Sequence, residues 1–403
     1  MSNNIKNYKK ECRQVINEFK KVIKSTDYFN SLMKNMLKQL PTKFNEACKK
    51  DYIDLKEYYE SNRDLEPKTI DELFERVYET ITKGPEWRGI KDPFNGLPLI
   101  NVFAKTIATE YGFLFFGHVV INEHMMRILD LWKEYLLSED SKKVLTKDGW
   151  LGMSTMDMFR HNKKDKYYGF KCWNDFFIRE FRNIDESRPL AKKAVVVSAC
   201  DCHIITFHKN LKFNTDFFRV KGDIYSLENM LGSLDRDIKK KFVGGSLVQG
   251  YLSAENYHRY HSPVTGTLVY ADVIPGTYFF VNNFLNKNKN VFCGQNQVMD
   301  SQQFLSNIQT RAVYVFKTRE IGYVAFIAIG MTEVSSCIVY DKLVGKVVKK
   351  GEEIGHFQYG GSTNIIIFDK EHVKKLKFTI KISNFNPKKE PLTELRSSIA
   401  ELK

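Results

Sequence analysis

Apolar side chains recur at intervals of three and four residues through much of the N-terminal part of the chain. One stripe runs from Ile5 to Ile23, a second from Phe29 to Leu40, and a third through residues 126–136. This spacing places apolar side chains on one face of a helix, which can then pack against other helices. Thr69 followed by Glu72 is a capping-box pattern, which predicts the start of a further helix.

The pattern changes after Trp150. The segment Phe170–Phe181 is aromatic and helix-like, and from Ala194 onward short apolar or alternating runs are separated by turn residues. Such runs are typical of β-strands. Strict alternation over residues 375–382 predicts a half-buried strand near the end of the chain. We therefore expect an α+β protein, with a helical extension over residues 1–150 and a β-rich domain over residues 151–403.

Composition narrows the class of protein. With 43% hydrophobic and 13% aromatic residues the chain is globular, and its net charge of +14 is compatible with nucleic acid or an anionic membrane surface. Much of this charge is scattered Lys, for which a solvated face is the commoner explanation. No apolar stretch approaches the roughly 18 residues of a membrane span, and residues 1–10 lack the apolar core of a signal peptide. We expect a cytoplasmic protein that can contact a membrane only peripherally.

The seven Cys residues are irregularly spaced, which fits reduced thiols in the cytosol. Cys200, Cys202 and His203 superficially resemble a metal cluster. Because no second Cys/His pair follows at zinc-finger spacing, we predict no metal site.

A glycine pair precedes a Ser-Thr pair near the C-terminus, at Gly360–Thr363, and an apolar run follows it. One interpretation is a tight turn, because glycine reaches positive φ without steric cost. The other is a backbone that cuts itself. Without a Cβ atom at Gly361, its carbonyl group is open to attack by the Ser362 hydroxyl, and strain in the turn would weaken that peptide bond.

Three further segments could supply chemistry to Ser362. His258 and His261 lie three residues apart beside a proline, and histidine is the usual general base near neutral pH. Asp201 ends an apolar strand, where it either forms a turn or orients a histidine as in a Ser-His-Asp triad. Pro275–Asn282 is a Pro-Gly turn that opens a strand, and by itself it indicates only a hairpin.

Together and in this order, these segments resemble the phosphatidylserine decarboxylase family of pyruvoyl-dependent enzymes. The resemblance covers about residues 170–370, and residues 70–150 look like the helical extension of a subgroup that includes soluble L-tryptophan decarboxylases. Ala199 and Cys202 stand where the family has Pro and Gly, and Phe280 stands where Ser is common. The matching segments are Phe176–Arg179 with Arg188–Pro189, Ser198–Cys202, Tyr257–His261, Pro275–Asn282 and Gly361–Thr363.

The resemblance implies a role for each candidate residue. His261, oriented by Asp201, would take the hydroxyl proton of Ser362, whose oxygen attacks Gly361. The chain would separate into a β-subunit of residues 1–361 and an α-subunit of residues 362–403, with Ser362 converted to a covalent pyruvoyl group. This cofactor would bind the substrate amine as a Schiff base, and His258 would return a proton after CO₂ leaves.

The substrate stays open at this point. The resemblance implies conversion of phosphatidylserine to phosphatidylethanolamine, with contact to an anionic membrane. The alternative is a soluble decarboxylase of a free aromatic amino acid such as L-tryptophan. A remote alternative is a non-catalytic basic protein that binds membranes or nucleic acid, although no nucleic-acid-binding signature is visible. A homodimer is suggested only by the family resemblance.

Overall fold

The computed structural model describes two compact units. The first comprises Met1–Met156, His161–Phe176 and Thr277–Ser301, and the second comprises Asp157–Arg160, Phe177–Gly276 and Gln302–Lys403. The boundary expected at residue 150 stays a prediction. Within these units the described residues are 3–38, 43–44, 67–89, 92, 95–107, 109–214, 225–278, 291–292, 301–331, 333, 336–359, 362–381 and 392–403.

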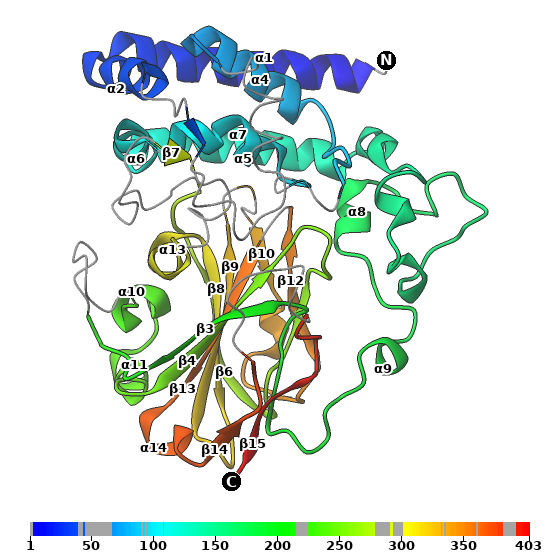
Figure 1. Ribbon diagram of the computed structural model, residues 1–403, viewed down its shortest axis with the longest axis vertical. Helices are drawn as coiled ribbons and strands as arrows, with labels where there is room; N and C mark the ends of the chain where they lie inside the picture. Colours follow the sequence, from blue (N-terminus) through cyan, green and yellow to red (C-terminus); the bar gives the residue numbers. More distant parts are fainter. Residues whose placement is uncertain are drawn as a thin grey trace. The chain divides into compact units, whose positions relative to one another are not determined.

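The first unit is helical, as the periodicity predicts. In Figure 1 its helices α1, α2 and α4 form one layer, and α5, α6 and α7 form a second layer beside them. A short parallel pair, β1 (Lys43–Phe44) and β7 (Val291–Phe292), also belongs to this unit. The helices are α1 (Asn3–Ser25), α2 (Asp27–Lys38), α4 (Ile70–Ile81), α5 (Pro98–Ile107), α6 (Glu110–Phe116) and α7 (Val119–Leu137).

The predicted start of α4 is confirmed. The Thr69 side chain accepts a hydrogen bond from the Glu72 N–H at 3.1 Å, and the Glu72 carboxylate accepts one from the Lys68 N–H at 2.7 Å. Both bonds satisfy backbone donors that a helix N-terminus leaves free. The stripes on α1 and α4 meet in an aromatic core, where the Phe19 and Phe74 rings lie edge to face 5.1 Å apart.

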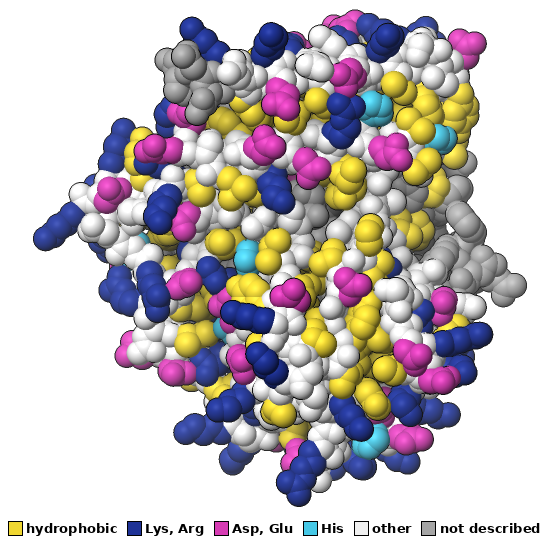
Figure 2. All heavy atoms as spheres, turned by 180° about the vertical axis from the view of Figure 1, so that it is seen from behind, with side chains coloured by type: hydrophobic (Ala, Val, Ile, Leu, Met, Phe, Trp, Pro, Cys, Tyr) yellow, Lys and Arg dark blue, Asp and Glu magenta, His cyan; other side chains and the backbone are white. Residues whose placement is uncertain are grey.

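No helix in the described part of the chain is both long enough and apolar enough to cross a membrane. On the face drawn in Figure 2, Lys and Arg side chains are interspersed with Asp, Glu and apolar side chains. The excess of positive charge is therefore not gathered into one patch on that face.

The second unit is built on three antiparallel sheets, two of three strands and one of seven. Their strands run in the orders β11-β6-β8-β9-β13-β4-β3, β10-β12-β5 and β14-β15-β2. The α+β class is thereby confirmed. The strands are β2 (Val196–Val197), β3 (His203–Lys209), β4 (Ser246–Leu252), β5 (Arg259–His261), β6 (Gly266–Ile274), β8 (Arg311–Lys317), β9 (Tyr323–Gly330), β10 (Ser336–Val339), β11 (Val347–Val348), β12 (Glu353–Gln358), β13 (Ser362–Phe368), β14 (Leu376–Phe378) and β15 (Ser398–Leu402).

Strand β13 lies inside the seven-stranded sheet, between β4 and β9, and all its residues are buried. Alternate residues of a strand face opposite sides of a sheet. Ile365 and Ile367 point into a core shared with α10 (Leu227–Leu231). The opposite face packs on the β10-β12-β5 sheet, because the Tyr260 ring lies 5.6 Å from that of Phe326, the partner of Ile366. This burial on both sides explains the continuous apolar run after Ser362.

The predicted C-terminal strand is shorter than its pattern. Alternation over residues 375–382 predicts one strand, whereas β14 covers only Leu376–Phe378. Residues 376–378 pair with residues 400–402 of β15, and the Thr379 N–H still donates to the Ile399 carbonyl oxygen at 3.0 Å. Residue 382 lies outside the described residues.

Candidate active site

Ser362 is the first residue of β13 and is fully buried. It lies in register with Leu252 of β4 and Gly330 of β9. Its Oγ makes no hydrogen bond to any residue that the structure describes. A buried hydroxyl normally has a partner, so this atom is a candidate for a chemical role. The predicted cleavage partner Gly361, with Gly360, lies outside the described residues.

The backbone leading into Ser362 is strained at Tyr359. This buried residue has φ of 64°, in the left-handed region that bulky residues rarely adopt. Strain of this kind costs on the order of 1–3 kcal/mol and persists only where the surroundings enforce it. Tyr359, three residues before Ser362, is thus held in an unfavourable conformation.

Two chain connections meet beside Ser362. Strand β4 leads into β5, and β12 leads into β13, while β4 pairs with β13 and β5 pairs with β12. Both connections therefore pass between the same two sheets at the same end. The Phe357 N–H donates to the His258 carbonyl oxygen at 2.9 Å and extends this pairing up to the connections. The fold thus brings the Tyr257–His261 motif to the Ser362 turn.

His258 is fully buried between aromatic rings. Its imidazole stacks on Phe177 with ring centroids 3.9 Å apart, and Phe357 lies edge-on at 6.5 Å. By strand alternation it shares the inner side of its segment with Tyr260, which packs on the seven-stranded sheet. Ser362 lies on the face of that sheet toward Tyr260, so His258 and Ser362 point into the same layer.

His261 occupies the other face of β5. Its Nδ1 lies 2.8 Å from the Gly351 carbonyl oxygen, and its Nε2 lies 3.2 Å from the Tyr257 hydroxyl. A carbonyl oxygen can only accept, so Nδ1 carries the proton and Nε2 keeps the lone pair. Burial lowers the pKa of His261 below its usual value, which keeps the ring neutral near pH 7. The ring therefore keeps a basic lone pair on Nε2, directed at Tyr257, and no hydrogen bond joins His261 to Ser362 in the described part of the chain.

The structure does not form the expected hydrogen bond between Asp201 and His261. The buried Asp201 carboxylate instead accepts Arg188 Nε–H at 2.8 Å and Nη2–H at 2.9 Å, and also the Leu395 N–H at 2.7 Å. The planar guanidinium fork satisfies both carboxylate oxygens. Asp201 therefore joins two motifs that the sequence presents separately, and the acceptor that orients His261 is the Gly351 carbonyl group.

The substitution of Gly by Cys202 has a visible counterpart. A Cβ atom at Gly250 would lie 2.5 Å from Cys202 Sγ, so the absence of a side chain on β4 makes room for this thiol. Burial raises the pKa of Cys202 to about 11, which keeps the thiol protonated. The Gly250 carbonyl oxygen also accepts the Thr363 hydroxyl at 2.8 Å. This contact fixes the residue after Ser362.

The start of the Pro-Gly segment is tied to the same strand. The Gly276 N–H donates to the Thr310 hydroxyl at 3.2 Å, and the Gly330 N–H donates to the Thr310 carbonyl oxygen at 2.9 Å. Since Gly330 lies opposite Ser362, Thr310 links the start of the segment to the strand position of Ser362. Phe280, where the family has Ser, lies outside the described residues.

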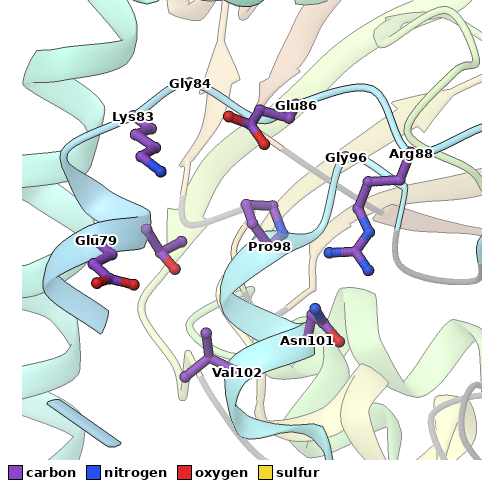
Figure 3. Close-up of a pocket in the computed structure, with 10 residues that line it drawn as sticks. Glu79, Lys83, Gly84, Glu86, Arg88, Gly96, Pro98, Asn101 and Val102 are labelled. Carbon is purple, nitrogen blue, oxygen red and sulfur yellow. The ribbon is translucent and has the colours of Figure 1, made fainter. Parts of the chain in front are cut away.

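The first unit contains a pocket of its own. A pocket of about 190 Å³ in the first unit has a mixed lining that includes Lys83, Arg88, Glu79 and Glu86, and it contains none of the predicted site residues (Figure 3). Among the described residues, no three His, Cys, Asp or Glu side chains lie together as a metal ion would need.

Comparison with known families decides the class. The family model for phosphatidylserine decarboxylase matches residues 173–388, and a second model of that description matches residues 13–159. The chain belongs to the phosphatidylserine decarboxylase family. It is therefore a decarboxylase, as the ordered motifs predict.

The relatives within this family have different names. Decarboxylase iboD of Amanita muscaria is 34% identical over 301 residues, which cover 68% of this chain and 84% of the relative. L-tryptophan decarboxylase of Psilocybe cubensis is 30% identical over 328 residues, 74% of this chain and 72% of the relative. Phosphatidylserine decarboxylase proenzyme of Fusobacterium nucleatum is 31% identical over 261 residues, 64% of this chain and 79% of the relative.

Sequence reasoning missed several residues of this decarboxylase site. Gly351 and Glu353 open the glycine-rich stretch but carry no motif of their own, and they become relevant only because β12 pairs with β5. Gln249 had a usable signal, since it is a polar residue inside the apolar run of β4. Its amide binds Tyr225, Ser306 and Thr363, the neighbour of Ser362.

Proposed function

We propose that this decarboxylase acts on a free amino acid through a pyruvoyl group made from its own Ser362. The observation that carries the proposal is the buried Ser362 hydroxyl, which has no partner among the described residues and lies three residues after the strained Tyr359. A pyruvoyl group supplies a ketone that takes up an amine and withdraws electrons from the bond that releases CO₂. Ser362 fits as its precursor, because no hydrogen bond to a described residue has to be broken first.

Alignment coverage supports the free amino acid. The β-rich region makes up less than two thirds of the chain, whereas the Psilocybe cubensis L-tryptophan decarboxylase aligns over 74% of it. That alignment must extend into the helical region. Phosphatidylserine decarboxylase proenzyme 2 of Oryza sativa aligns over 52%, which the β-rich region alone can accommodate. The helical region therefore takes part in the match to the L-tryptophan decarboxylase.

Self-processing begins with the chain's own groups. The Ser362 hydroxyl gives its proton to His261 Nε2, and its oxygen bonds to the Gly361 carbonyl carbon while the peptide C–N bond breaks. The freed nitrogen takes that proton, and the product is an ester. Loss of the Ser362 Cα proton then breaks the Cβ–O bond and expels the Gly361 carboxylate, which keeps the former serine oxygen. The dehydroalanine left at position 362 adds water and releases ammonia, which leaves the ketone.

Tyr257 has a part in this first transfer. Its hydroxyl lies 3.2 Å from His261 Nε2, the nitrogen that accepts the proton. The Tyr257 hydroxyl therefore either relays the proton from Ser362 to Nε2, or it moves away so that the Ser362 hydroxyl can reach Nε2. Asp201 acts at a distance, by holding the loop whose Ala199 carbonyl oxygen accepts the His261 N–H at 2.9 Å.

His258 serves the decarboxylation itself. It lies on the side of its segment that faces the layer of Ser362, walled by Phe177. From there it protonates the carbon that has lost CO₂. Rigid aromatic packing holds the imidazole in one orientation, which is the requirement for a positioned acid.

Phosphatidylserine is the second candidate substrate. The Fusobacterium nucleatum enzyme, named for this lipid, aligns over 79% of its length. Purified protein assayed for CO₂ release from free aromatic amino acids and from phosphatidylserine vesicles separates the candidates. Release from the vesicles alone would overturn the amino-acid proposal. An uncut chain without CO₂ release from either would remove both and favour a non-catalytic binding protein.

A further inference from the structure

The residue directly opposite His261 is an acid. Glu353 is the first residue of β12 and pairs with His261, the last residue of β5. The pairing is irregular between Glu353 and Gly355, so a contact shows the face: the Glu353 carboxylate accepts Arg259 Nη1–H at 2.7 Å, and Arg259 and His261, two residues apart in β5, project to the same side. The Glu353 side chain is partly buried. A carboxylate thus lies beside the proposed base, on the face where the imidazole lies.

The Glu353 carboxylate is held in place through one oxygen. Its Oε1 accepts Arg259 Nη1–H at 2.7 Å and the Tyr340 hydroxyl at 2.7 Å. Tyr340 also lies 3.2 Å from His356 Nδ1, so the chain of hydrogen bonds continues along the outer face of β12. These contacts fix the carboxylate without using Oε2.

Other charges near His261 already have partners. Arg259 is shared between Glu353 and Glu180, and Arg396 binds Asp185 at 2.8 Å. Asp201 binds Arg188. Arg259 and Arg396 lower the pKa of His261, while Glu353 and the Gly351 carbonyl group raise it against the larger effect of burial. Of the carboxylates in these pairs, Glu353 alone lies directly across a strand pair from His261.

We infer that Glu353 is a positioning residue for His261: its carboxylate stabilises the imidazolium that forms when His261 takes the Ser362 proton. The Gly351 carbonyl group complements it by fixing the tautomer. Gly351 can hold this carbonyl because its φ of +80° suits glycine. In this assignment, Glu353 of β12 stabilises the imidazolium, which is the role of the carboxylate in a Ser-His-Asp triad. It rests on the proposed self-processing.

The first test follows cleavage in full-length protein. Uncut chains from cell-free synthesis are transferred into buffers of different pH, and the uncut fraction is followed on denaturing gels. Glu353→Gln keeps the hydrogen-bond acceptor but removes the charge. We expect cleavage to slow by on the order of tenfold, because the base is weaker. We also expect the acid limb of the rate profile to move down by about half a pH unit or more, since the pKa of His261 falls without the carboxylate.

Glu352→Gln is the matched control. Glu352 is the exposed neighbour, and its carboxylate accepts the Lys349 N–H at 2.9 Å, which an amide oxygen can also do. This variant should keep the wild-type rate and profile. Wild-type behaviour of E353Q, or an equal shift in E352Q, overturns the inference. Failure of the wild-type chain to cleave would instead contradict the proposed function.

A second measurement does not depend on cleavage. In the uncut Ser362→Ala background, the His261 titration is followed by NMR of labelled histidine, with and without E353Q. We expect a lower pKa in E353Q, and an unchanged titration overturns the inference. If E353Q does not fold, Glu353→Asp replaces it. Because the aspartate carboxylate lies farther from His261, the pKa of His261 should fall by a smaller amount. An unchanged pKa of His261 would overturn the inference.

Discussion

The two histidines of the Tyr257–His261 motif have different surroundings. His258 is stacked on Phe177, whereas His261 has a defined tautomer and a carboxylate across the strand. They also lie on opposite faces of their segment. An assignment of separate roles therefore has a structural basis, and the residues can be tested one at a time.

We expect His261→Ala to remain uncut and His258→Ala to cleave but lose most turnover. The reason is that His261 is neutral and keeps its lone pair on Nε2, while His258 faces the layer that contains Ser362. Denaturing gels report cleavage, and CO₂ release reports turnover. Equal cleavage of the two variants would refute this division, and the reverse pattern would make His258 the base for Ser362.

The ring of His356 on β12 predicts a pH effect on stability. Burial, with a contribution from Arg259, lowers the pKa of His356 to about 4. The unfolded chain keeps a value near 6.5 and therefore binds more protons between these pH values. The stability that the folded protein gains by keeping His356 neutral is thus fully present above about pH 6.5, and it is lost as the pH falls toward 4.

We expect His356→Gln to reduce the loss of stability between pH 6.5 and 4 by about 1–3 kcal/mol. Glutamine can still bind Tyr340 and Gln358, the present partners of the ring. Urea unfolding of the two proteins across this range measures the difference. Parallel curves for wild type and variant would contradict the assignment.

At the scale of elements, β13 is stabilised from both neighbours and from one helix. Gln249 of β4 binds Ser306 on α13 (Gln302–Ile308) at 3.0 Å and Thr363 on β13 at 3.3 Å. Its Oε1 accepts the Tyr225 hydroxyl at 2.5 Å. One buried amide thus connects a strand, a helix and the residue next to Ser362.

We expect Gln249→Leu to lower the free energy of unfolding by about 1–3 kcal/mol, because buried polar partners lose their hydrogen bonds. Misplacement of Thr363 should also slow self-cleavage. Gln14→Leu on the exposed side of α1 is the control and should change stability by less than about 0.5 kcal/mol. Denaturant melts of the uncut Ser362→Ala forms compare them directly, and equal melts would show that the amide network contributes little.

At the scale of the whole molecule, the predicted cut falls inside the fold. Residues 362–403 contribute β13 to the seven-stranded sheet and β14 and β15 to another. The first of these strands is hydrogen-bonded on both edges. The proposed processing removes the nitrogen of Ser362 but leaves the pairing of residues 363–368 available.

We therefore expect wild-type protein to give two bands on denaturing gels but one peak in native gel filtration. Ser362→Ala should stay at the 47.1 kDa of the intact chain. Borohydride added with substrate should attach substrate to the N-terminus of the smaller piece. Two separate native peaks would contradict the structural role of β13, and a cut S362A chain would remove Ser362 as the nucleophile.

Much of this protein follows from the sequence alone. Periodicity predicts α1, α4 and α7, and alternation predicts most strands, because burial of one face imposes its period on the residues themselves. The glycines before Ser362 and the two nearby histidines identify the candidate chemistry, because that chemistry requires these residue types within a few positions of one another in the sequence. Contacts between residues far apart in the sequence cannot be predicted in this way. That Asp201 binds Arg188, and that Gly351 and Glu353 flank His261, depends on strand register between distant segments, which only the tertiary structure decides.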